Sequence, residues 1–372
     1  MARERAVARV NVAAIERNVG RLLAATGPDV ALCAVVKADG YGHGAVPAAR
    51  AALAGGATSL AVAAAREAAD LRAAGIDAPV LVLGALTESE LEIALDARAE
   101  IVAWREAFVR AVVRPARVHV KLDTGMGRLG TRDTDEATRT ADAIAAAPHL
   151  ELAGAMTHFA TADEPGDAFM GEQLERFAAW AGPLRERHPG LVLHAANSAA
   201  TLRDPATHFD LVRTGIAIYG LDPFQRDPAE HGLEPALELH SYVAEVKPIA
   251  AGESAGYGRR FVADAPTTLA TIPIGYGDGV RRALTNNADV LLGGRRRPLR
   301  GAVSMDNITV DIGQGEPGAA RGDDAVLIGA QDGERVLAEE WARRLHTINY
   351  EVTCGISRRV PRVYHRDGVP QA

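Results

Sequence analysis

Lysine is rare in this chain, so each lysine is a candidate for chemistry that needs an amine. The 372 residues include 41 lysines and arginines in total, of which only Lys37, Lys121 and Lys247 are lysines. Arginine meets nearly every ordinary need for positive charge, but a guanidinium neither loses its proton nor acts as a nucleophile. Lys247 lies in a strand-like segment and is expected to be a solvated surface residue. Lys37 and Lys121 therefore remain as candidates for a chemical role.

Lys37 stands at the end of an apolar run and before a glycine-rich loop, in the segment LCAVVKADGYGHG. Burial disfavours an ammonium group and lowers a lysine pKa from its usual value of about 10.4, which makes the neutral amine available. A neutral lysine amine forms a Schiff base with an aldehyde cofactor. The glycines let the backbone approach a ligand closely, and His43 is expected to cap the following helix. The segment predicts an aldehyde-cofactor site at Lys37.

The first 220 residues alternate short apolar runs with alanine-rich amphipathic segments, of which 64–75 and 167–188 predict helices. Strands that are apolar on both faces and separated by helices are typical of parallel β/α units. An open doubly wound sheet gives the same local signals, but eight regular units without an early G-x-G-x-x-G favour a closed (β/α)8 barrel. The predicted strands are 32–37, 59–63, 79–84, 100–104, 117–123, 150–158, 191–197 and 210–215.

After a stretch rich in proline and charged residues at 222–235, the alternation of strand-like and helical segments ends. Strand-like segments separated by glycine, proline and aspartate then predict a mainly β second domain. We place an α/β barrel domain at residues 1–232 and the second domain at 233–372, with pairing of about the first ten residues with the β domain as an alternative for that segment. The β segments are 236–249, 267–275, 289–294, 307–312 and 324–329.

In barrel enzymes the reacting groups lie at the C-terminal ends of the strands and in the loops that follow. The loops after strands seven and eight are the usual phosphate site. Here they supply the Ser198 hydroxyl and the backbone N–H groups around Gly215, which suit a phosphate ester. The unusual residues at the predicted strand ends are Lys37, Lys121, His158, Asn197, Ser198, Arg213, Gly215 and Ile216.

Composition limits the partners and the compartment. A net charge of -7 argues against a general binder of nucleic acid or acidic membranes, and the basic run at 295–300 is too short to change that. No apolar run of about 18 residues predicts a membrane span, and the N-terminal residues lack the apolar core of a secretory signal. The two cysteines, Cys33 and Cys354, show no metal-binding spacing, so no metal is expected. A cytoplasmic protein is expected.

Eight motifs together resemble the alanine racemase family, in order and with near-family spacing from about residue 5 to residue 364. The resemblance implies an enzyme that depends on pyridoxal 5′-phosphate (PLP), built from a (β/α)8 barrel and a β domain. It also implies a homodimer with shared active sites that makes D-alanine from L-alanine for peptidoglycan. The motifs are AVVKADGYGHG, KLDTGMGRLG, MTHFAT, HAANSAA, LVRTGIAIYG, GYGRRF, IPIGYGDG and VSMDN.

The resemblance assigns a role to individual residues. It implies that Lys37 holds PLP and acts as one proton-transfer base, and that Tyr257 is the opposing base, reaching in from the other subunit. Arg213 is similar to the residue that faces the pyridine nitrogen, and His158 to a link between Tyr257 and Arg213. Further implied roles are phosphate binding by Tyr41, Ser198, Gly215 and Ile216, flanked by Asn197; substrate binding by Arg128, Met305 and Tyr276; and support of the site by His194 and Asp306.

These implied roles agree with the requirements of racemisation. The α-proton leaves on one face and a proton returns on the other, so two bases must face each other. A tyrosine, with an ordinary pKa of about 10, is a poor base at neutral pH unless positive charge or hydrogen bonds stabilise its anion. The implied chain from Arg213 through His158 to Tyr257 would do so. An arginine at the pyridine nitrogen keeps that nitrogen unprotonated, which makes PLP a weaker electron sink and limits side reactions.

Lys121 has two readings. The resemblance implies a lysine carbamylated by CO2, whose new carboxylate orients Arg128 across the turn DTGMG. The alternative is an ordinary salt bridge between Lys121 and Asp123 or a neighbouring residue.

One departure from the family pattern leaves the substrate range open. Arg358 stands where some members carry a tyrosine that contacts the cofactor phosphate and narrows the pocket. Strict preference for alanine over serine is therefore in doubt, and a broader amino-acid racemase is one alternative. A non-catalytic PLP carrier is another, although such proteins resemble the barrel alone. A decarboxylase of similar architecture is disfavoured because it would place an acid, not Arg213, at the pyridine nitrogen.

Overall fold

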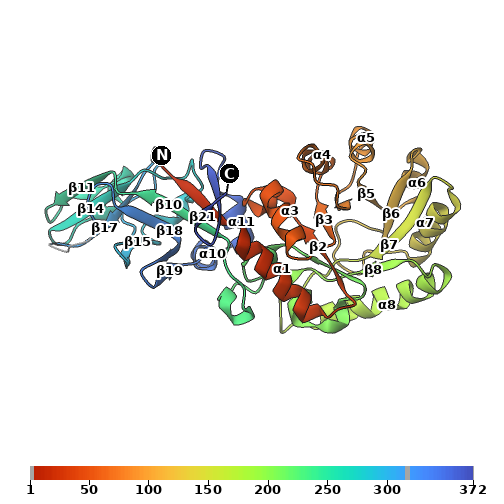
Figure 1. The fold of residues 1–372 in the computed structure, drawn as a ribbon. Coiled ribbons are helices and arrows are strands. Elements are labelled where there is room, and N and C mark those ends of the chain that lie inside the picture. Colours follow the sequence, from red (N-terminus) through yellow and green to blue (C-terminus); the bar gives the residue numbers. More distant parts are fainter. Residues whose placement is uncertain (1–3, 315–318, 372) are drawn as a thin grey trace. The chain divides into compact units, whose positions relative to one another are not determined.

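The computed structural model describes residues 4–314 and 319–371, which form two compact units (Figure 1). Residues 15–218 make up the barrel unit. The described residues up to Ala14 and those from Tyr219 onward make up the β unit. Each unit contains its own sheets and its own buried apolar side chains, so each is described separately.

The barrel unit, all of whose residues the structure describes, contains eight parallel strands that pair in chain order, with the last beside the first. Between the two remaining neighbours, the N–H groups of Asp210 and Arg213 donate to the carbonyl oxygens of Leu193 and Ala196, which closes the ring. The barrel is therefore confirmed and the open sheet is wrong. The strands are β2 (Ala31–Val35), β3 (Ser59–Val62), β4 (Val80–Val82), β5 (Glu100–Ala103), β6 (Ala116–Lys121), β7 (Leu150–Met156), β8 (Val192–His194) and β9 (Leu211–Thr214).

Helices lie around the outside of these strands in Figure 1. Alanine favours helix strongly, and side chains fix several helix starts. Thr87 and Glu90 form a capping box at one helix, and Asp133 accepts the N–H groups of Asp135 and Glu136 at another. The helices are α1 (Val12–Thr26), α3 (Ala45–Ala54), α4 (Ala65–Ala73), α5 (Glu88–Asp96), α6 (Glu106–Ala111), α7 (Thr134–Ala146), α8 (Phe169–Arg187) and α9 (Ser198–Arg203).

The β unit is mainly β, as predicted. Its largest sheet joins β1 (Val7–Asn11), β10 (Leu237–Tyr242), β15 (Asp289–Leu292), β16 (Arg295–Pro298), β18 (Asp324–Gln331), β19 (Glu334–Val336), β20 (Arg362–Arg366) and β21 (Val369–Pro370). A smaller sheet joins β11 (Glu245–Ile249), β14 (Thr267–Ile272) and β17 (Ile308–Asp311), and a hairpin pairs β12 (Ser254–Ala255) with β13 (Phe261–Val262). Two helices, α10 (Ala338–Leu345) and α11 (Asn349–Cys354), follow β19.

Two boundaries in the β unit differ from the sequence prediction. The segment 236–249 was expected as one strand, but the chain changes sheets within it, because Val243 donates its N–H to Asp323 and Ala244 donates its N–H to Thr271. The unit also begins at Tyr219 rather than at residue 233. Ala236 donates its N–H to the Tyr219 carbonyl oxygen at 3.0 Å, which ties this segment to β10.

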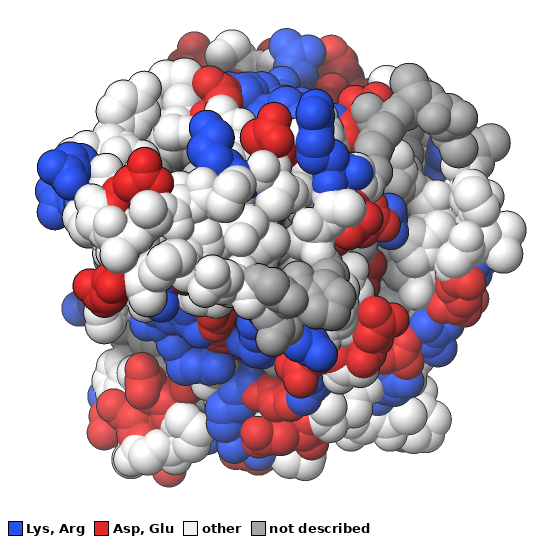
Figure 2. All heavy atoms as spheres, turned by 90° about the vertical axis from the view of Figure 1, so that its left-hand side faces the viewer, with Lys and Arg blue, Asp and Glu red and all other residues white. Residues whose placement is uncertain are grey.

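Charges of both signs are interspersed on the face of the molecule in Figure 2. The basic run at 295–300 lies on and after β16, where Arg296 forms ion pairs with Glu340 at 2.9 Å and with Asp289 at 3.6 Å. This run is therefore balanced locally by carboxylates. In residues 4–314 and 319–371, no helix is both long enough and apolar enough to cross a bilayer.

Gly220 is expected to be essential for the start of the β unit. Its φ is +73°, and a β-carbon there would lie 1.6 Å from the Glu234 carbonyl oxygen. Gly220→Ala should lower the free energy of unfolding by about 3 kcal/mol, from left-handed strain plus steric overlap. Gly252→Ala is the matched control, because Gly252 has φ +83° but no atom within 4 Å of its added β-carbon. Urea denaturation should show a loss of only about 1 kcal/mol for the control, and equal losses would contradict the steric argument.

Candidate active site

The residues predicted to share one rim do lie at the C-terminal ends of the barrel strands. Lys37 was expected to end a strand, but β2 stops at Val35 and Lys37 opens a short turn, α2 (Lys37–Tyr41). The others keep their expected order around the ring. They are Lys121 at the end of β6, His158 after β7, Asn197 and Ser198 after β8, and Arg213, Gly215 and Ile216 in and after β9.

The turn that follows Lys37 has a left-handed backbone. Ala38, Asp39, Gly40 and Tyr41 have φ values of 52°, 52°, 61° and 53°. A left-handed residue with a β-carbon costs roughly 1–2 kcal/mol, so this turn is strained. It brings the Tyr41 ring beneath Lys37, whose Nζ lies 5.9 Å from the ring centroid.

Side chains and backbone hold the strained turn in place. Glu67 accepts the Ala38 N–H at 2.6 Å, and Asp39 accepts the Ala45 N–H at 2.9 Å. His43 was expected to cap the next helix, but α3 begins after Gly44 without a side-chain cap. The His43 Nδ1 atom instead lies 3.0 Å from the Gly40 carbonyl oxygen, so His43 braces the turn. Its role is a correction to the sequence prediction.

The predicted phosphate residues gather on one side of this turn. A β-carbon at Gly215 would lie 2.4 Å from the Tyr41 hydroxyl, so only glycine allows this approach. The buried Ser198 Oγ accepts the N–H groups of Gly215 at 2.9 Å and Ala217 at 3.3 Å, which leaves its own O–H to donate. Asn197 does not join this group through its side chain, which accepts the Ala200 N–H and begins α9. Ile216 is buried beside Gly215.

Arg213 is a buried guanidinium that only acceptors surround. Its nitrogens donate to the carbonyl oxygens of Thr157 at 2.7 Å, His194 at 2.8 Å and Ala195 at 3.0 Å. They also lie 2.9 Å from His194 Nδ1 and 3.4 Å from His158 Nδ1. Burial lowers the pKa of Arg213 to about 10, so the group stays charged at neutral pH.

Arg213 dictates the state of both histidines. Burial, and then the Arg213 charge, lower the pKa of His158 and of His194 well below the usual value, so both rings are neutral at neutral pH. Because a guanidinium only donates, the Nδ1 atom of each ring accepts and the ring proton is on Nε2. His158 therefore presents an N–H donor on the side away from Arg213.

Lys121 ends β6 as a buried amine. Burial, together with the charges of Arg213 and Arg128, lowers its pKa to about 8, although Asp123 opposes the shift. About a tenth of this amine is therefore neutral at pH 7. Arg128 lies exposed on the loop after β6, and its charge also lowers the pKa of His158.

The loop after β6 is organised by Asp123. Its carboxylate accepts the N–H groups of Gly125 and Gly127, each at 3.0 Å, and the Arg132 Nε–H at 3.2 Å. These hydrogen bonds hold the pKa of Asp123 below its usual range, although burial opposes them. Asp123 thus fixes the loop that carries Arg128.

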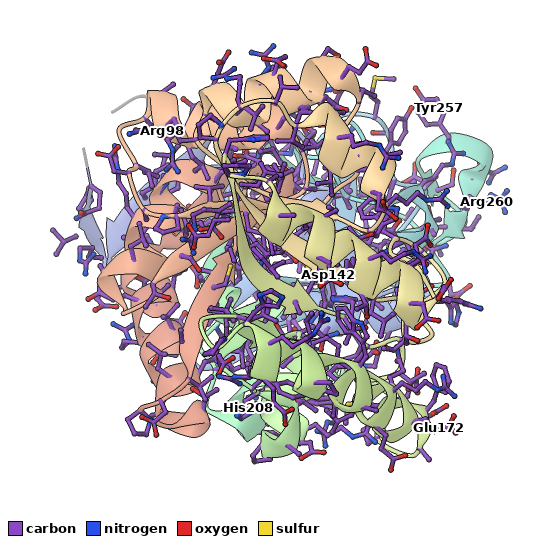
Figure 3. All side chains as sticks on the ribbon, turned by 90° about the vertical axis from the view of Figure 1, so that its right-hand side faces the viewer. Arg98, Asp142, Glu172, His208, Tyr257 and Arg260 are labelled. Atoms are coloured by element: carbon purple, nitrogen blue, oxygen red, sulfur yellow. The ribbon has the colours of Figure 1, made fainter. Side chains whose placement is uncertain are left out.

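The predicted residues of the β unit share one exposed region. Tyr257, Met305 and Tyr276 are 71%, 51% and 41% exposed, which is unusual for large apolar side chains. The Tyr276 N–H donates to the Ser304 carbonyl oxygen at 2.9 Å, which joins the loops that carry Tyr276 and Met305. Figure 3 labels Tyr257, whose side chain points away from the ribbon that carries it.

A hollow of about 420 Å³ lies beside Tyr257, lined also by Ala302, Ser304 and Thr309. The neighbouring loop is held by Arg359, which forms ion pairs with Asp306 at 2.6 Å and with the buried Asp278 at 3.3 Å. Asp306 thus fixes the loop that carries Met305. Arg358, where the family pattern departs, is exposed.

Two residues that the sequence analysis missed extend the Arg213 cluster. His119 Nδ1 lies 2.8 Å from His194 Nε2, and His119 Nε2 lies 2.7 Å from Glu100 Oε2. A signal for His119 was present in the segment RVHVKLD, where Arg117, His119 and Lys121 alternate with valines. Alternation places the three polar residues on one face of the strand. Nothing in the sequence pointed to Glu100.

The rim residues of the barrel unit suit an anionic ligand that carries an aldehyde. Lys37 supplies an amine, Ser198 supplies a hydroxyl donor, and Arg213, Lys121 and Arg128 supply positive charge. A phosphate ester bound at Ser198 would receive hydrogen bonds in a buried site. An aromatic aldehyde with such a phosphate fits this set of donors.

The chain matches two family models, one for each unit. The model of the alanine racemase N-terminal domain matches residues 10–223, and that of the alanine racemase C-terminal domain matches residues 236–364.

Relatives with known names and structures match nearly the whole chain. An alanine racemase of Thermobifida fusca is 44% identical over 96% of this chain and 98% of the relative, and one of Frankia casuarinae is 43% identical over 97% and 96%. The crystal structure of alanine racemase from Streptomyces lavendulae is 38% identical with a TM-score of 0.90 over 98% of each chain. That of Bacillus anthracis, solved with bound L-Ala-P, is 37% identical with a TM-score of 0.91 over 100% and 98%. On both domains and nearly its full length, this chain belongs to the alanine racemase family.

Proposed function

We propose that this protein is an alanine racemase that interconverts L-alanine and D-alanine and supplies D-alanine for peptidoglycan in the cytoplasm. The observation that carries the proposal is the family match over both domains. The cluster of neutral histidines around the buried Arg213 supports it independently. A carrier that resembles the barrel alone would not need a second domain with an exposed tyrosine.

PLP is the proposed cofactor, since alanine racemases depend on it and the rim residues fit it. Lys37 would hold its aldehyde carbon, Tyr41, Ser198 and Gly215 would hold its phosphate, and Arg213 would face its ring nitrogen. When bound, PLP accepts electron density from the α-carbon as the proton leaves. The fixed charge of Arg213 keeps the ring nitrogen unprotonated, which limits that electron withdrawal.

Lys37 and Tyr257 are the proposed pair of bases. The Lys37 amine takes or returns the α-proton on one face of the substrate, and the Tyr257 phenolate does so on the other. His158 supports the phenolate with an N–H donor at Nε2, because its Nδ1 atom accepts from Arg213. The neutral His158 ring stabilises the phenolate by donating this hydrogen bond, and it does not transfer its proton.

The active site is proposed to be shared between two subunits. Tyr257, Met305 and Tyr276 are exposed together in the β unit, although each has a proposed role at the substrate. Such large exposed side chains typically mark an interface. A second copy of the chain that covers this region would bury them and bring Tyr257 to its partner's Lys37.

Lys121 is proposed to be carbamylated. Carbamylation requires a neutral amine, and burial lowers the pKa of Lys121 to about 8. The carbamate would replace one positive charge by one negative charge beside Arg128 and Arg213. It would thereby hold Arg128 for the substrate carboxylate, while Asp123 holds the loop itself.

Removing either proposed base should stop racemisation. Lys37→Ala should leave almost no activity toward L-alanine, and Tyr257→Phe should reduce it at least about a hundred-fold, since one proton transfer is lost. A coupled assay of D-alanine formation measures this, and chiral chromatography of the products measures the comparison substrates L-serine and L-lysine. Lys247→Ala and Tyr364→Phe are the controls, at an exposed lysine and at a partly buried tyrosine of β20. Full activity of Tyr257→Phe would remove Tyr257 from the mechanism.

Mixing the two inactive variants tests the shared site. In a mixed dimer of Lys37→Ala and Tyr257→Phe, one site carries both substitutions and the other carries neither. The mixed dimers should therefore show about half of the wild-type activity, since one of their two sites is intact. The assay uses dimers purified through two different tags. Sites built from one chain alone would give no recovery.

Carbamylation of Lys121 should increase with pH. The neutral fraction of the amine rises as pH passes through about 8, so the adduct should grow from about pH 6 to about pH 9 in bicarbonate. Native mass spectrometry measures the added mass of one CO2. Lys121→Arg should show no addition, because a guanidinium stays protonated. An equal addition in Lys121→Arg would place the adduct elsewhere.

A further inference from the structure

A continuous chain of polar groups crosses the interior of the barrel, where branched aliphatic side chains usually fill the space. It runs from Arg213 to His194 at 2.9 Å, from His194 to His119 at 2.8 Å and from His119 to Glu100 at 2.7 Å. Both imidazoles are fully or almost fully buried. Buried polar groups are costly unless each is paired, and here each pairs with the next.

Donor and acceptor accounting fixes the direction of every bond in this chain. Arg213 can only donate, so His194 accepts at Nδ1 and carries its proton on Nε2. That proton faces His119 Nδ1, which must accept, so His119 carries its proton on Nε2 and donates it to Glu100. An ionised carboxylate can only accept, so the two ends of the chain demand the same orientation.

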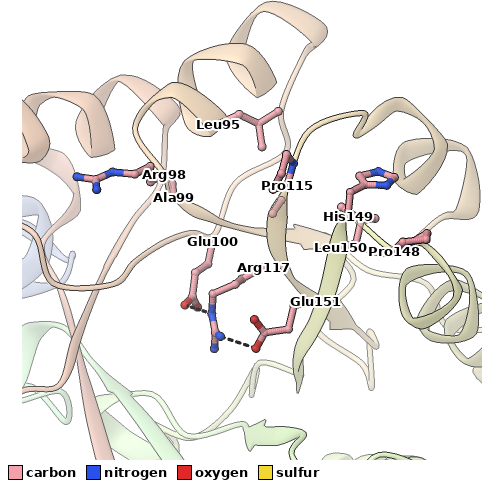
Figure 4. A pocket seen from close by; sticks show the side chains of 11 residues that line it. Leu95, Arg98, Ala99, Glu100, Pro115, Arg117, Pro148, His149, Leu150 and Glu151 are labelled. Atoms are coloured by element: carbon pink, nitrogen blue, oxygen red, sulfur yellow. Dashed lines mark hydrogen bonds and ion pairs between the residues drawn. The ribbon is translucent and has the colours of Figure 1, made fainter.

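The Glu100 carboxylate is the end of this hydrogen-bond chain that lies nearest to solvent. Glu100 is the first residue of β5, at the face of the barrel opposite the Lys37 rim. Figure 4 shows Glu100, Arg117 and Glu151 beside a hollow of about 400 Å³. Burial raises the pKa of Glu100, but hydrogen bonds from His119 and Arg117 outweigh it and hold the pKa below its usual range. Glu100 therefore stays ionised at neutral pH.

The neighbouring strand leaves room for this arrangement. A β-carbon at Gly154 on β7 would lie 2.3 Å from His119 Nδ1, the atom that accepts from His194. The pairing of β6 with β7 also shifts register between Val118 and His119. The absence of a side chain at Gly154 thus sets the position of the His119 ring.

We propose that Glu100 and His119 are positioning residues for Arg213, which they hold through the tautomer of His194. If the chain were reversed, His194 would present an N–H to the guanidinium, and two donors would face each other. Arg213 would then lose the bond at 2.9 Å and its fixed orientation at the rim. The inference rests on the proposed function in one respect, that Arg213 faces the ring nitrogen of PLP.

The tautomers are measured directly by nitrogen-15 NMR of histidine side chains in the full-length protein with PLP bound. His194 and His119 should both be neutral and protonated on Nε2. Assignment uses His194→Gln and His119→Phe, each of which removes one set of ring signals. A proton on Nδ1 of His194, or a cationic His119, would overturn the proposal. If PLP fails to bind, the proposed function fails, yet the tautomers can still be measured on the same chain.

Three variants test the consequence for turnover. Glu100→Gln retains the shape but can donate as well as accept, so it permits the reversed chain. His119→Phe breaks the chain, and Gly154→Ala displaces the His119 ring without removing a polar group. Each should lower kcat about ten-fold, which corresponds to about 1.4 kcal/mol, with KM for alanine within about two-fold. In Glu100→Gln the Nδ1–H form of His119 should also become populated.

Glu151→Gln is the matched control, because Glu151 is exposed and contacts Arg117 but not His119. It should leave both kcat and the tautomers unchanged. Unchanged kcat and unchanged His194 tautomer in Glu100→Gln, His119→Phe and Gly154→Ala would refute the positioning role. If a variant does not fold, the tautomers of the wild-type protein still decide the orientation of the chain.

Discussion

A guanidinium enclosed within a barrel can be kept only if the groups around it accept hydrogen bonds, and this requirement organises the site. Arg213 binds three carbonyl oxygens and the Nδ1 atoms of two histidines. Burial and the Arg213 charge together keep both rings neutral, and the guanidinium fixes which nitrogen carries each proton. His158 then presents its Nε2–H on the side away from Arg213, and His194 begins a chain of hydrogen bonds to Glu100. The tautomers of both His158 and His194 therefore follow from the buried Arg213 guanidinium.

The charge of Arg213 also makes anionic groups favourable at the rim. Arg213 and Arg128 both lower the pKa of Lys121, so three basic groups compete in one region. A phosphate, a substrate carboxylate and a carbamate would each relieve that competition. The carboxylate of Asp123 contributes less, since its oxygens are bound to the backbone of its own loop and to Arg132. The family's cofactor and substrate are thus the kind of ligands that this arrangement requires.

Much of this arrangement could be predicted from the sequence. Apolar runs between helical segments indicated the strands, and parallel strands necessarily bring Lys37, His158 and Arg213 to one rim. The left-handed turn was not predictable, because Ala38 and Asp39 have no preference for such a backbone. Glu100 and His119 are 19 positions apart on neighbouring strands, and the register between β5 and β6, which pairs Val102 with His119, decides whether they meet. The start of the β unit at Tyr219 could not be predicted either, because it involves a hydrogen bond from Ala236, which is distant in the sequence.

The left-handed turn after Lys37 affects how much the site must rearrange when a ligand binds. Its backbone is unfavourable, yet Glu67, Asp39 and His43 hold it in place. These contacts are made within the chain, so the strain is met when the chain folds, and folding itself positions the Lys37 amine and the Tyr41 ring. A preorganised site loses little conformational entropy on association. Because the free-energy cost of the strained turn is met during folding, it does not reduce the affinity for a ligand.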